Sequence, residues 1–405
     1  MQKLFNTLGR HKETFRPVRK GTVTIFTCGP SVYQRSHIGN FRTFLFEDVL
    51  VRYLEYAGYN VCRGMNYTDV EDKALDEAAK RKITVRQLTE SNIKEFIREM
   101  KLLKMKLPDY LPKASESVSS AVEIIRQLLA RGIAYWYRGN VYFDPLKFPG
   151  FGKLYGLDMS AWPKKKIRFH KDTYPGIQWN LGDFILWHGC KGKETLCWDT
   201  GIGKGRPSWN IQDPSMISRY FQETLSIYCG GIDNLYRHHD YSLAVLESIR
   251  PYPMARYWLH CHHLYVDGKK MSKSSGNIIY TDTVRSKGYT LTELRFFLTY
   301  SHYRETLNYS EDTMRSAAAL LRAFKKQVRK IGQKAGSKSD TQAQTVQGIK
   351  KAFSQAMDND LNVKAAFDGI CKIISGIKPE GLCPGEAAGI ISSIKEVDKV
   401  FRVIL

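Results

Sequence analysis

Residues 27–40 read TCGPSVYQRSHIGN, and this stretch decides how the surrounding chain folds. It follows the run Val23-Thr24-Ile25-Phe26, which is rich in β-branched residues and typical of a buried strand. Beyond it, apolar residues recur at helical spacing over 41–56. A strand, a loop with glycine, proline and serine, and then a helix present backbone N–H groups and a positive helix end to phosphate. We therefore predict an α/β fold with a Rossmann-like parallel sheet that binds a nucleotide.

A second stretch, Lys270-Met271-Ser272-Lys273-Ser274, lies far downstream and supplies two lysines. A histidine in one loop and paired lysines in another suit a nucleoside triphosphate. The reason is that positive charge must neutralise the phosphates as they are displaced. The two stretches together predict a site for a nucleoside triphosphate.

The chain has a strong positive charge. Its 405 residues allow two or three domains with a sizeable core. The 62 lysines and arginines exceed the 40 acidic residues and give a formal net charge of +22. This excess predicts a polyanionic partner, with nucleic acid as the first candidate. A charged surface that serves only solubility is the alternative.

The sequence carries no signal for a membrane or for secretion. No apolar stretch is long enough to span a bilayer, and the N-terminal residues lack the apolar core of a signal peptide. The eight cysteines are scattered and form no CxxC pair. In a chain of this length, that pattern argues against a disulfide framework and for a reducing compartment. We expect a cytoplasmic protein with no membrane partner.

Composition and periodicity divide the chain into four regions. We expect residues 1–131 and 195–290 to form the two halves of a catalytic nucleotide-binding domain. Residues 132–194 are rich in aromatic residues, glycine and short β-like runs, carry three consecutive lysines at 164–166, and read as an insertion between the halves. Residues 291–405 show helical patterns and predict a bundle, with a loop between helices at 335–346.

Six blocks of sequence, in order, resemble one enzyme family. HIGN at 37–40 and KMSKS at 270–274 resemble the ATP motifs of class I aminoacyl-tRNA synthetases. TCGPSVY, NYTDVEDK, WDTGIGKGRPSW and GGIDNLYRHHD resemble cysteinyl-tRNA synthetase in particular. The resemblance runs from about residue 4 to about residue 370. In that family an anticodon-binding region follows the helical bundle, and this sequence shows no counterpart to it.

The resemblance implies that an amino-acid carboxylate attacks ATP, accompanied by Mg²⁺, and that pyrophosphate leaves. It assigns His37 and Asn40 to the phosphates from the first loop, and Lys270 and Lys273 from the second. Preplaced donors lower the barrier because negative charge grows on the bridging and leaving oxygens. The other ATP-binding residues that it implies are Gly29, Gly39, Gly230, Gly231, Asp233, Met271, Ser272 and Ser274.

The amino-acid pocket departs from the family pattern. Cysteinyl-tRNA synthetases hold zinc through two cysteines, a histidine and a glutamate, and the zinc binds the substrate thiolate. The matching positions here are Cys28, Asp213, His238 and Ser242, so two of the four ligands differ. Cys28, Asp213 and His238 would leave an open three-ligand site, although fewer thiolates weaken zinc binding. Alternatively, Cys28 packs as a small apolar group, and Asp213 and His238 bind hydrogen-bonding groups.

The polar lining of the pocket is altered as well. Asn210 and Gln212 replace the usual histidine and glutamate. The hypothesis that follows is an amino acid other than cysteine, with a polar or cationic side chain facing Asp213. The pocket residues implied by the resemblance are Cys28, Thr68, Trp209, Asp213, His238 and Ser242.

Two further groups of residues have a simple structural interpretation. His262 and His263 lack further ligand spacing, and we expect them in the core or beside a phosphate rather than on a metal. The lysines within 325–338 lie on a predicted helix. They are either a solvated face or a track for RNA phosphates.

Three functions are compatible with these patterns. The first is amino-acid activation through an aminoacyl-adenylate and transfer to the acceptor end of tRNA, as in a cysteine–tRNA ligase. The second is transfer to a small-molecule amine, as in the cysteine ligase of mycothiol synthesis. The third is a catalytically silent RNA-binding paralog. Complete HIGN and KMSKS loops argue against the third, since a silent protein has no need of lysines that close over phosphates.

Overall fold

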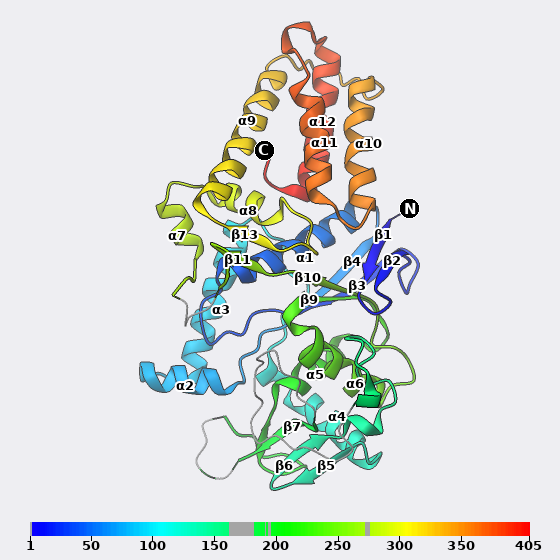
Figure 1. Ribbon diagram of the computed structural model, residues 1–405, viewed down its shortest axis with the longest axis vertical. Coiled ribbons are helices and arrows are strands. Elements are labelled where there is room, and N and C mark those ends of the chain that lie inside the picture. Colours follow the sequence, from blue (N-terminus) through cyan, green and yellow to red (C-terminus); the bar gives the residue numbers. More distant parts are fainter. Residues whose placement is uncertain (1, 162–181, 191, 193–195, 272–275) are drawn as a thin grey trace.

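The computed structural model describes every residue except Met1 and residues 162–181, 191, 193–195 and 272–275. In Figure 1 a central sheet lies between a helical bundle at one end and a mixed α/β lobe at the other. This architecture confirms the predicted α/β class with a parallel sheet and a C-terminal helical bundle. The lysines at 164–166 and most of the KMSKS loop lie outside the described residues.

The central sheet has four parallel strands. Their order is β10 (Ala255–Cys261), β9 (Leu225–Gly231), β3 (Thr22–Thr27) and β4 (Asn60–Met65). The register places Thr27 opposite Cys229, and Cys229 in turn opposite Leu259. Because parallel strands end at the same edge of a sheet, the segments that follow β3, β9 and β10 gather there. Helix α1 (Ile38–Tyr56) connects β3 to β4.

Helical spacing of apolar residues over 74–103 predicts helix there, and the structure divides this part of the chain into two helices, α2 (Asp72–Arg81) and α3 (Val85–Leu102). The break falls at Lys82, which has a φ of 55°, and Thr84 then caps α3 through its side chain. As a result α3 returns along the loop that precedes α1. There Asn92 Nδ2 donates a hydrogen bond to the Val32 carbonyl at 2.9 Å.

A second, antiparallel sheet forms the mixed lobe. It consists of β5 (Ala134–Tyr137), β6 (Asn140–Phe143), β7 (Phe184–Gly189) and β8 (Gly205–Pro207), in that order. Helices α4 (Val118–Ala130), α5 (Trp209–Tyr220) and α6 (Tyr241–Glu247) contribute to the apolar cluster around it. The expected boundary of the β-rich insertion at residue 194 falls between β7 and β8, which pair with each other in this sheet.

One cysteine pair forms a bond that the sequence did not predict. The structure joins Cys190 to Cys197 in a disulfide, whereas the scattered cysteines argued against a disulfide framework. The two cysteines are seven positions apart, a spacing that resembles no redox or metal motif. Among the described residues, no helix is both long and apolar enough to cross a membrane.

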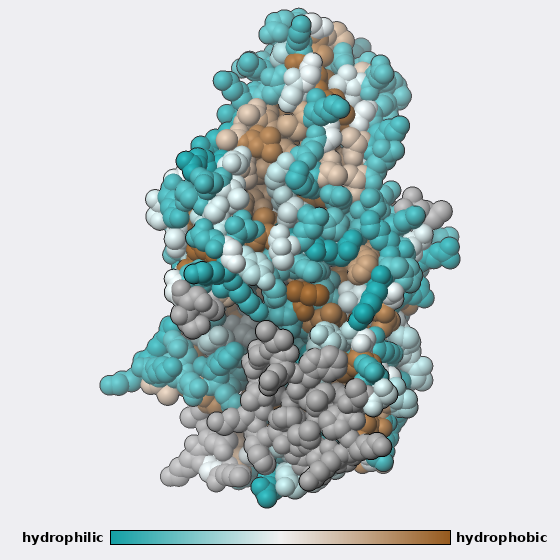
Figure 2. Space-filling view, viewed as in Figure 1, coloured by the Kyte–Doolittle hydropathy of each residue, from teal (hydrophilic) through white to brown (hydrophobic). Residues whose placement is uncertain are grey.

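The C-terminal bundle stands on the central sheet. Its helices are α8 (Leu291–Thr299), α9 (Glu311–Gly332), α10 (Gln344–Asp358), α11 (Val363–Ser375) and α12 (Pro384–Phe401). A buried ion pair, Arg295 Nη2 to Asp48 Oδ2 at 2.6 Å, ties α8 to α1. On the face shown in Figure 2, hydrophilic residues cover the outer sides of the bundle and apolar residues gather between its helices.

The remaining elements are small. The hairpin β1 (Lys3–Asn6) and β2 (His11–Thr14) forms the N-terminus. A three-stranded sheet has the order β12 (Lys269–Lys270), β11 (Leu264–Val266) and β13 (Leu307–Tyr309). Helix α7 (Thr281–Ser286) follows the second ATP motif. The strand β12 brings Lys270 back toward the edge of the central sheet.

Candidate active site

A cavity of about 330 Å³ opens at the carboxyl edge of the central sheet. The two stretches singled out in the sequence meet in it, although more than two hundred positions separate them. The predicted site residues that line it are Cys28, Gly29, His37, Gly39, Asn40, Thr68, Trp209, Gly231, Asp233, His238, Lys270 and Met271. Gly230, Asp213 and Ser242 are buried outside this lining. Ser272, Lys273 and Ser274 lie outside the described residues.

His37 is the residue that caps helix α1. Its Nδ1 accepts a hydrogen bond from the Asn40 backbone N–H at 3.3 Å, and Asn40 Oδ1 accepts one from the His37 N–H at 3.0 Å. Burial lowers the pKa of His37 to about 4, against an opposing effect of Asp233. The ring is therefore neutral at pH 7. Because Nδ1 is an acceptor, we assign the proton to Nε2, which leaves one N–H donor for a ligand.

Two glycines at this edge allow a close approach of neighbouring groups. A Cβ atom at Gly29 would lie 1.8 Å from the Asn66 carbonyl oxygen, which belongs to the backbone and cannot move aside cheaply. A Cβ at Gly230 would lie 2.6 Å from Cε1 of His239. Both positions were predicted to bind ATP, and the structure gives each a packing reason as well.

Asp213 forms the centre of the pocket floor and is completely buried. Its Oδ1 accepts a hydrogen bond from Asn66 Nδ2 at 2.9 Å. Its Oδ2 contacts His238 Nε2 at 2.9 Å and accepts bonds from Tyr228 and from the Cys28 thiol at 3.3 Å. Burial alone would raise the pKa of Asp213, but the charge of His238 and these hydrogen bonds outweigh it and lower the pKa. Its oxygens are thus occupied by protein groups rather than turned toward a cationic substrate.

A chain of histidines extends from Cys28 in the opposite direction. Cys28 Sγ lies 2.9 Å from His239 Nε2, and His239 Nδ1 lies 2.7 Å from His260 Nε2. His260 Nδ1 then lies 2.8 Å from the Thr7 hydroxyl. Burial lowers the pKa of His239 well below its ordinary value and that of His260 to about 3, so both rings are neutral. Sequence analysis missed His239, although it stands beside His238 in the block GGIDNLYRHHD.

Three buried side chains of the pocket carry atoms that can bind zinc. Ligand atoms of Cys28, His238 and His239 lie within 4.8 Å of one another, and this cluster could hold a metal ion. Tetrahedral zinc bonds of about 2.0–2.3 Å keep neighbouring ligand atoms roughly 3.3–3.7 Å apart. Here Cys28 to His239 and His238 to Asp213 are at 2.9 Å, the distance of a hydrogen bond.

Two other features describe the side chains of this cluster. Burial, followed by the charge of Asp213, raises the pKa of the Cys28 thiol well above its ordinary value, so the thiol is protonated in the hydrogen-bond network. His238 Nδ1 is buried with no hydrogen-bond partner among the described residues, while its Nε2 bonds the Asp213 carboxylate, so this histidine by itself is compatible with a metal at Nδ1. The residues fit a closed hydrogen-bond network better than they fit zinc.

We therefore expect the purified protein to carry much less than one zinc per chain. Elemental analysis by mass spectrometry after gel filtration measures this directly. Exposure to a chelator should leave the melting temperature unchanged, because the network is held by hydrogen bonds. One tightly bound zinc per chain, with a chelator-sensitive melting temperature, would contradict the assignment.

The altered polar residues of α5 have structural partners. Asn210 Nδ2 donates to the Ile185 carbonyl at 2.9 Å, and Gln212 Nε2 donates to the Val70 carbonyl at 2.6 Å. Neither residue lines the cavity. The interpretation of both as a changed substrate lining is therefore corrected: Asn210 bonds β7 within the mixed lobe, and Gln212 bonds the segment that follows β4. Trp209 does line the cavity and stacks on the His238 ring at 3.9 Å.

Some residues that line the cavity were not among the predicted site residues, and two histidines had been given no definite role. Tyr33 and Lys73 line the cavity, and Lys73 belongs to the block NYTDVEDK, which was its available signal. His262 and His263 also line it, and burial lowers the pKa of both. Among the described residues, the metal cluster does not include them. The interpretation that they lie near phosphate remains a prediction.

Comparisons with known proteins define the class. The family described as "tRNA synthetases class I (C) catalytic domain" matches residues 14–319. A cysteine–tRNA ligase from Chlamydia caviae is 37% identical over 411 residues, which cover 99% of this chain and 86% of that protein. A cysteine–tRNA ligase from Thermococcus onnurineus is 34% identical and covers 93% of this chain and 79% of that protein.

A solved structure agrees at the level of the fold. Methionyl-tRNA synthetase from Mycobacterium tuberculosis in complex with methionyl-adenylate superimposes with a TM-score of 0.63 at 14% identity, covering 95% of this chain and 90% of that one. The family match over residues 14–319 and these relatives show a class I aminoacyl-tRNA synthetase, and the fold agrees. Within that class, the chain belongs to the cysteine–tRNA ligase family.

Proposed function

We propose that the protein activates an amino acid with ATP, through an aminoacyl-adenylate, and transfers the aminoacyl group to tRNA in the manner of a cysteine–tRNA ligase. One observation carries the proposal. His37, Lys270 and Asp233 line the same cavity as Thr68 and Trp209, which the family resemblance assigns to the amino acid. A nucleotide and an amino acid would therefore meet in one place.

Each residue has a physical role in this proposal. The Nε2–H of His37 donates to a phosphate oxygen of ATP, and its neutral ring needs no proton from solvent at pH 7. Lys270 and Lys273 balance the charge that develops on the leaving pyrophosphate, and Mg²⁺ would accompany the nucleotide. Asp233 accepts hydrogen bonds from the ribose hydroxyls. Asn40 holds the loop that carries His37 through the cap of α1.

The pocket floor supports a second candidate. Asp213 and Ser242 stand where the family has a cysteine and a glutamate, and the network around Asp213 does not fit zinc. Without zinc to select a thiolate, the pocket would read a different side chain, and the acceptor could then be a small amine instead of tRNA. The domain division at residues 131, 194 and 290, and a cytoplasmic location where ATP and tRNA are both present, are part of the same proposal.

The test is amino-acid-dependent exchange of ATP with pyrophosphate, run with each of the twenty amino acids, with and without tRNA. Exchange with cysteine, followed by formation of cysteinyl-tRNA, is the expected result. Exchange with a different amino acid would favour the second candidate. The Lys273→Ala variant serves as the inactive control. Absence of exchange with every amino acid, together with salt-sensitive tRNA binding, would replace the proposal with a silent RNA-binding function.

The bundle offers a separate test of the tRNA partner. On α9, Lys326, Arg329 and Lys330 are exposed, and none forms an ion pair with a described residue. We expect the double variant Lys326→Glu/Lys330→Glu to weaken tRNA binding by roughly tenfold or more at low salt. It should also reduce the salt dependence of binding, because about two phosphate contacts are lost.

Filter binding across a salt series measures both quantities. The matched control is Lys350→Glu/Lys351→Glu, which makes the same change in net charge on the exposed side of α10. Equal losses in the two variants would mean that net charge, and not the face of α9, attracts tRNA.

A further inference from the structure

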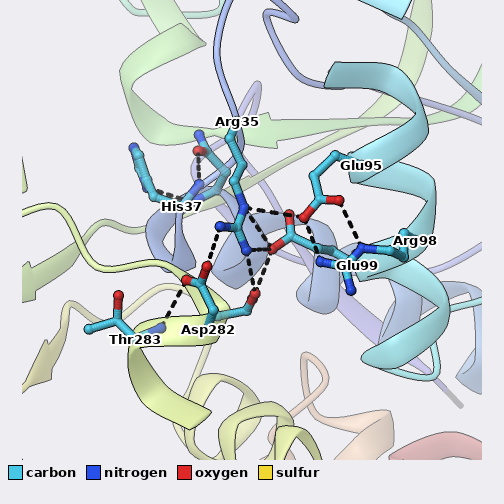
Figure 3. A network of polar contacts seen from close by, with 9 residues as sticks. Arg35, His37, Glu95, Arg98, Glu99, Asp282 and Thr283 are labelled. Carbon is cyan, nitrogen blue, oxygen red and sulfur yellow. Dashed lines mark hydrogen bonds and ion pairs between the residues drawn. The ribbon is translucent and has the colours of Figure 1, made fainter. Parts of the chain in front are cut away.

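Arg35 lies two positions before His37, in the loop between β3 and α1, and its side chain reaches two distant segments. Its Nη2 donates to Glu99 Oε1 on α3 at 2.7 Å, and its Nη1 donates to Asp282 Oδ2 on α7 at 2.6 Å. Its Nη2 also contacts the Thr281 hydroxyl at 3.2 Å. Figure 3 shows the guanidinium between the helix that carries Glu99 and the start of α7.

The same three segments are joined by other bonds. The Thr281 hydroxyl donates to Glu99 Oε1 at 2.5 Å, and the Glu99 side chain is completely buried. The backbone N–H of Ile38 donates to the Ile279 carbonyl at 3.0 Å. Residues 276–282 follow the second ATP motif directly, so these bonds attach its downstream arm to the loop that carries His37.

The charges around Arg35 indicate what it does. Three carboxylates, those of Glu95, Glu99 and Asp282, lie within 3.5 Å of its nitrogens. Its positive charge is therefore already balanced by protein carboxylates. A side chain that binds phosphate would instead need positive charge that the protein does not neutralise. A guanidinium can address several carboxylates at once because its donors form a rigid planar fork. The arrangement holds segments in place and leaves little charge for a ligand.

We propose that Arg35 is a positioning residue that sets the distance between the two ATP loops. It holds the arm after Lys270 against the N-terminus of α1, and Glu99 is the buried anchor on which both are fixed. The inference rests on the proposed activation of an amino acid by ATP. In that reaction the donors of the two loops must contact one triphosphate, and small misplacements are costly: a shift of about 1 Å can cost on the order of a hundredfold in rate.

Three variants and one control test the proposal. Arg35→Leu is expected to lower kcat of ATP–pyrophosphate exchange by about tenfold to a hundredfold, with KM for the amino acid changed less than about twofold. Arg35→Lys should recover only part of the rate, because one ammonium cannot reach Glu99, Thr281 and Asp282 together. Asp282→Asn keeps the buried Glu99 pair and should lower kcat less, in the same direction. Arg98→Leu removes a cation bound to Glu95 on the same helix and should change nothing.

Two further measurements separate positioning from direct contact and from loss of fold. The double variant Arg35→Leu/Asp282→Asn should be no slower than Arg35→Leu, because both remove one connection. Hydrogen exchange of the amides of 277–286 should accelerate in Arg35→Leu and in Asp282→Asn but not in Arg98→Leu.

Different results would contradict the role of Arg35 and the proposed function. The proposal would be overturned if Arg35→Leu raised KM for ATP without changing kcat and if Asp282→Asn behaved like the wild-type protein. Arg35 would then be a phosphate ligand. Equal behaviour of Arg35→Leu and Arg98→Leu would overturn it too. If the wild-type protein shows no exchange with any amino acid, the proposed function fails. The amide exchange of 277–286 still decides whether Arg35 holds this arm.

Discussion

His37→Asn is expected to lower the rate of ATP–pyrophosphate exchange by on the order of a hundredfold or more while leaving the fold intact. The substitution removes the Nε2–H donor at the cavity. Asparagine is among the best residues for capping a helix, so α1 should begin as before. His37→Ala should lose the same rate and, in addition, about 1 kcal/mol of stability with the cap. Exchange kinetics and thermal unfolding of both variants measure the two effects separately.

The pH dependence of the wild-type protein checks the same assignment. The pKa of His37 is lowered to about 4 by burial, so its ring gains a proton only as the pH falls toward that value. The stability that comes from a neutral His37 is present above the ordinary histidine pKa of about 6.5 and is lost as the pH falls below it. The rate should therefore be level between about pH 6 and 8. A rate that halves near pH 6.5, absent from His37→Asn, would mean that a charged imidazole is required.

Asp213→Ala is expected to have the largest effect on stability, with a loss of roughly 3–5 kcal/mol. The completely buried carboxylate accepts bonds from Asn66, Cys28, Tyr228 and His238. Removing it takes one acceptor from each of these buried groups, and each unmade bond costs about 1–3 kcal/mol before relaxation. Thermal unfolding should show a drop of many degrees. Glu90→Ala, which breaks an exposed ion pair with Arg86 on α3, should show no measurable change.

The same experiment distinguishes a hydrogen-bond network from a metal site. If Asp213 acts only as an acceptor, the loss is the same before and after treatment with a chelator. If Asp213 is a metal ligand, the chelator alone destabilises the wild-type protein and has no further effect on Asp213→Ala. Wild-type stability in Asp213→Ala under both conditions would show that the network contributes little to folding.

Local patterns predicted the frame of the site well. The β-branched run before Cys28 lies within β3 (Thr22–Thr27), and the helix expected over 41–56 is α1, which begins earlier, at Ile38. Both depend on side-chain periodicity over neighbouring positions, which a sequence displays directly. The break between α2 and α3 was missed, because the left-handed turn occurs at Lys82, a residue type that gives no warning of it.

The sequence predicted which residues form the pocket, but it did not predict the hydrogen bonds between them. Cys28, Asp213 and His238 were expected together, and the structure places them in contact. Asp213 was expected to face the substrate, yet four protein donors already surround it. His239 and Asn66 complete the network and were not among the predicted residues. Hydrogen-bond partners so distant in sequence leave no periodic signal, so no pattern along the chain revealed them.

By itself the sequence determined the class of fold, the two ATP motifs and the departure of two pocket positions from the family pattern. These depend on the order and spacing of residue types. The tertiary structure decided how those residues are used. It buried Asp213 among protein hydrogen-bond donors and paired Asn210 and Gln212 with backbone carbonyls. It also placed Arg35 in contact with Glu99 and Asp282. Such outcomes depend on which segments become neighbours when the parallel strands align, and on burial, which makes every unpaired polar group costly.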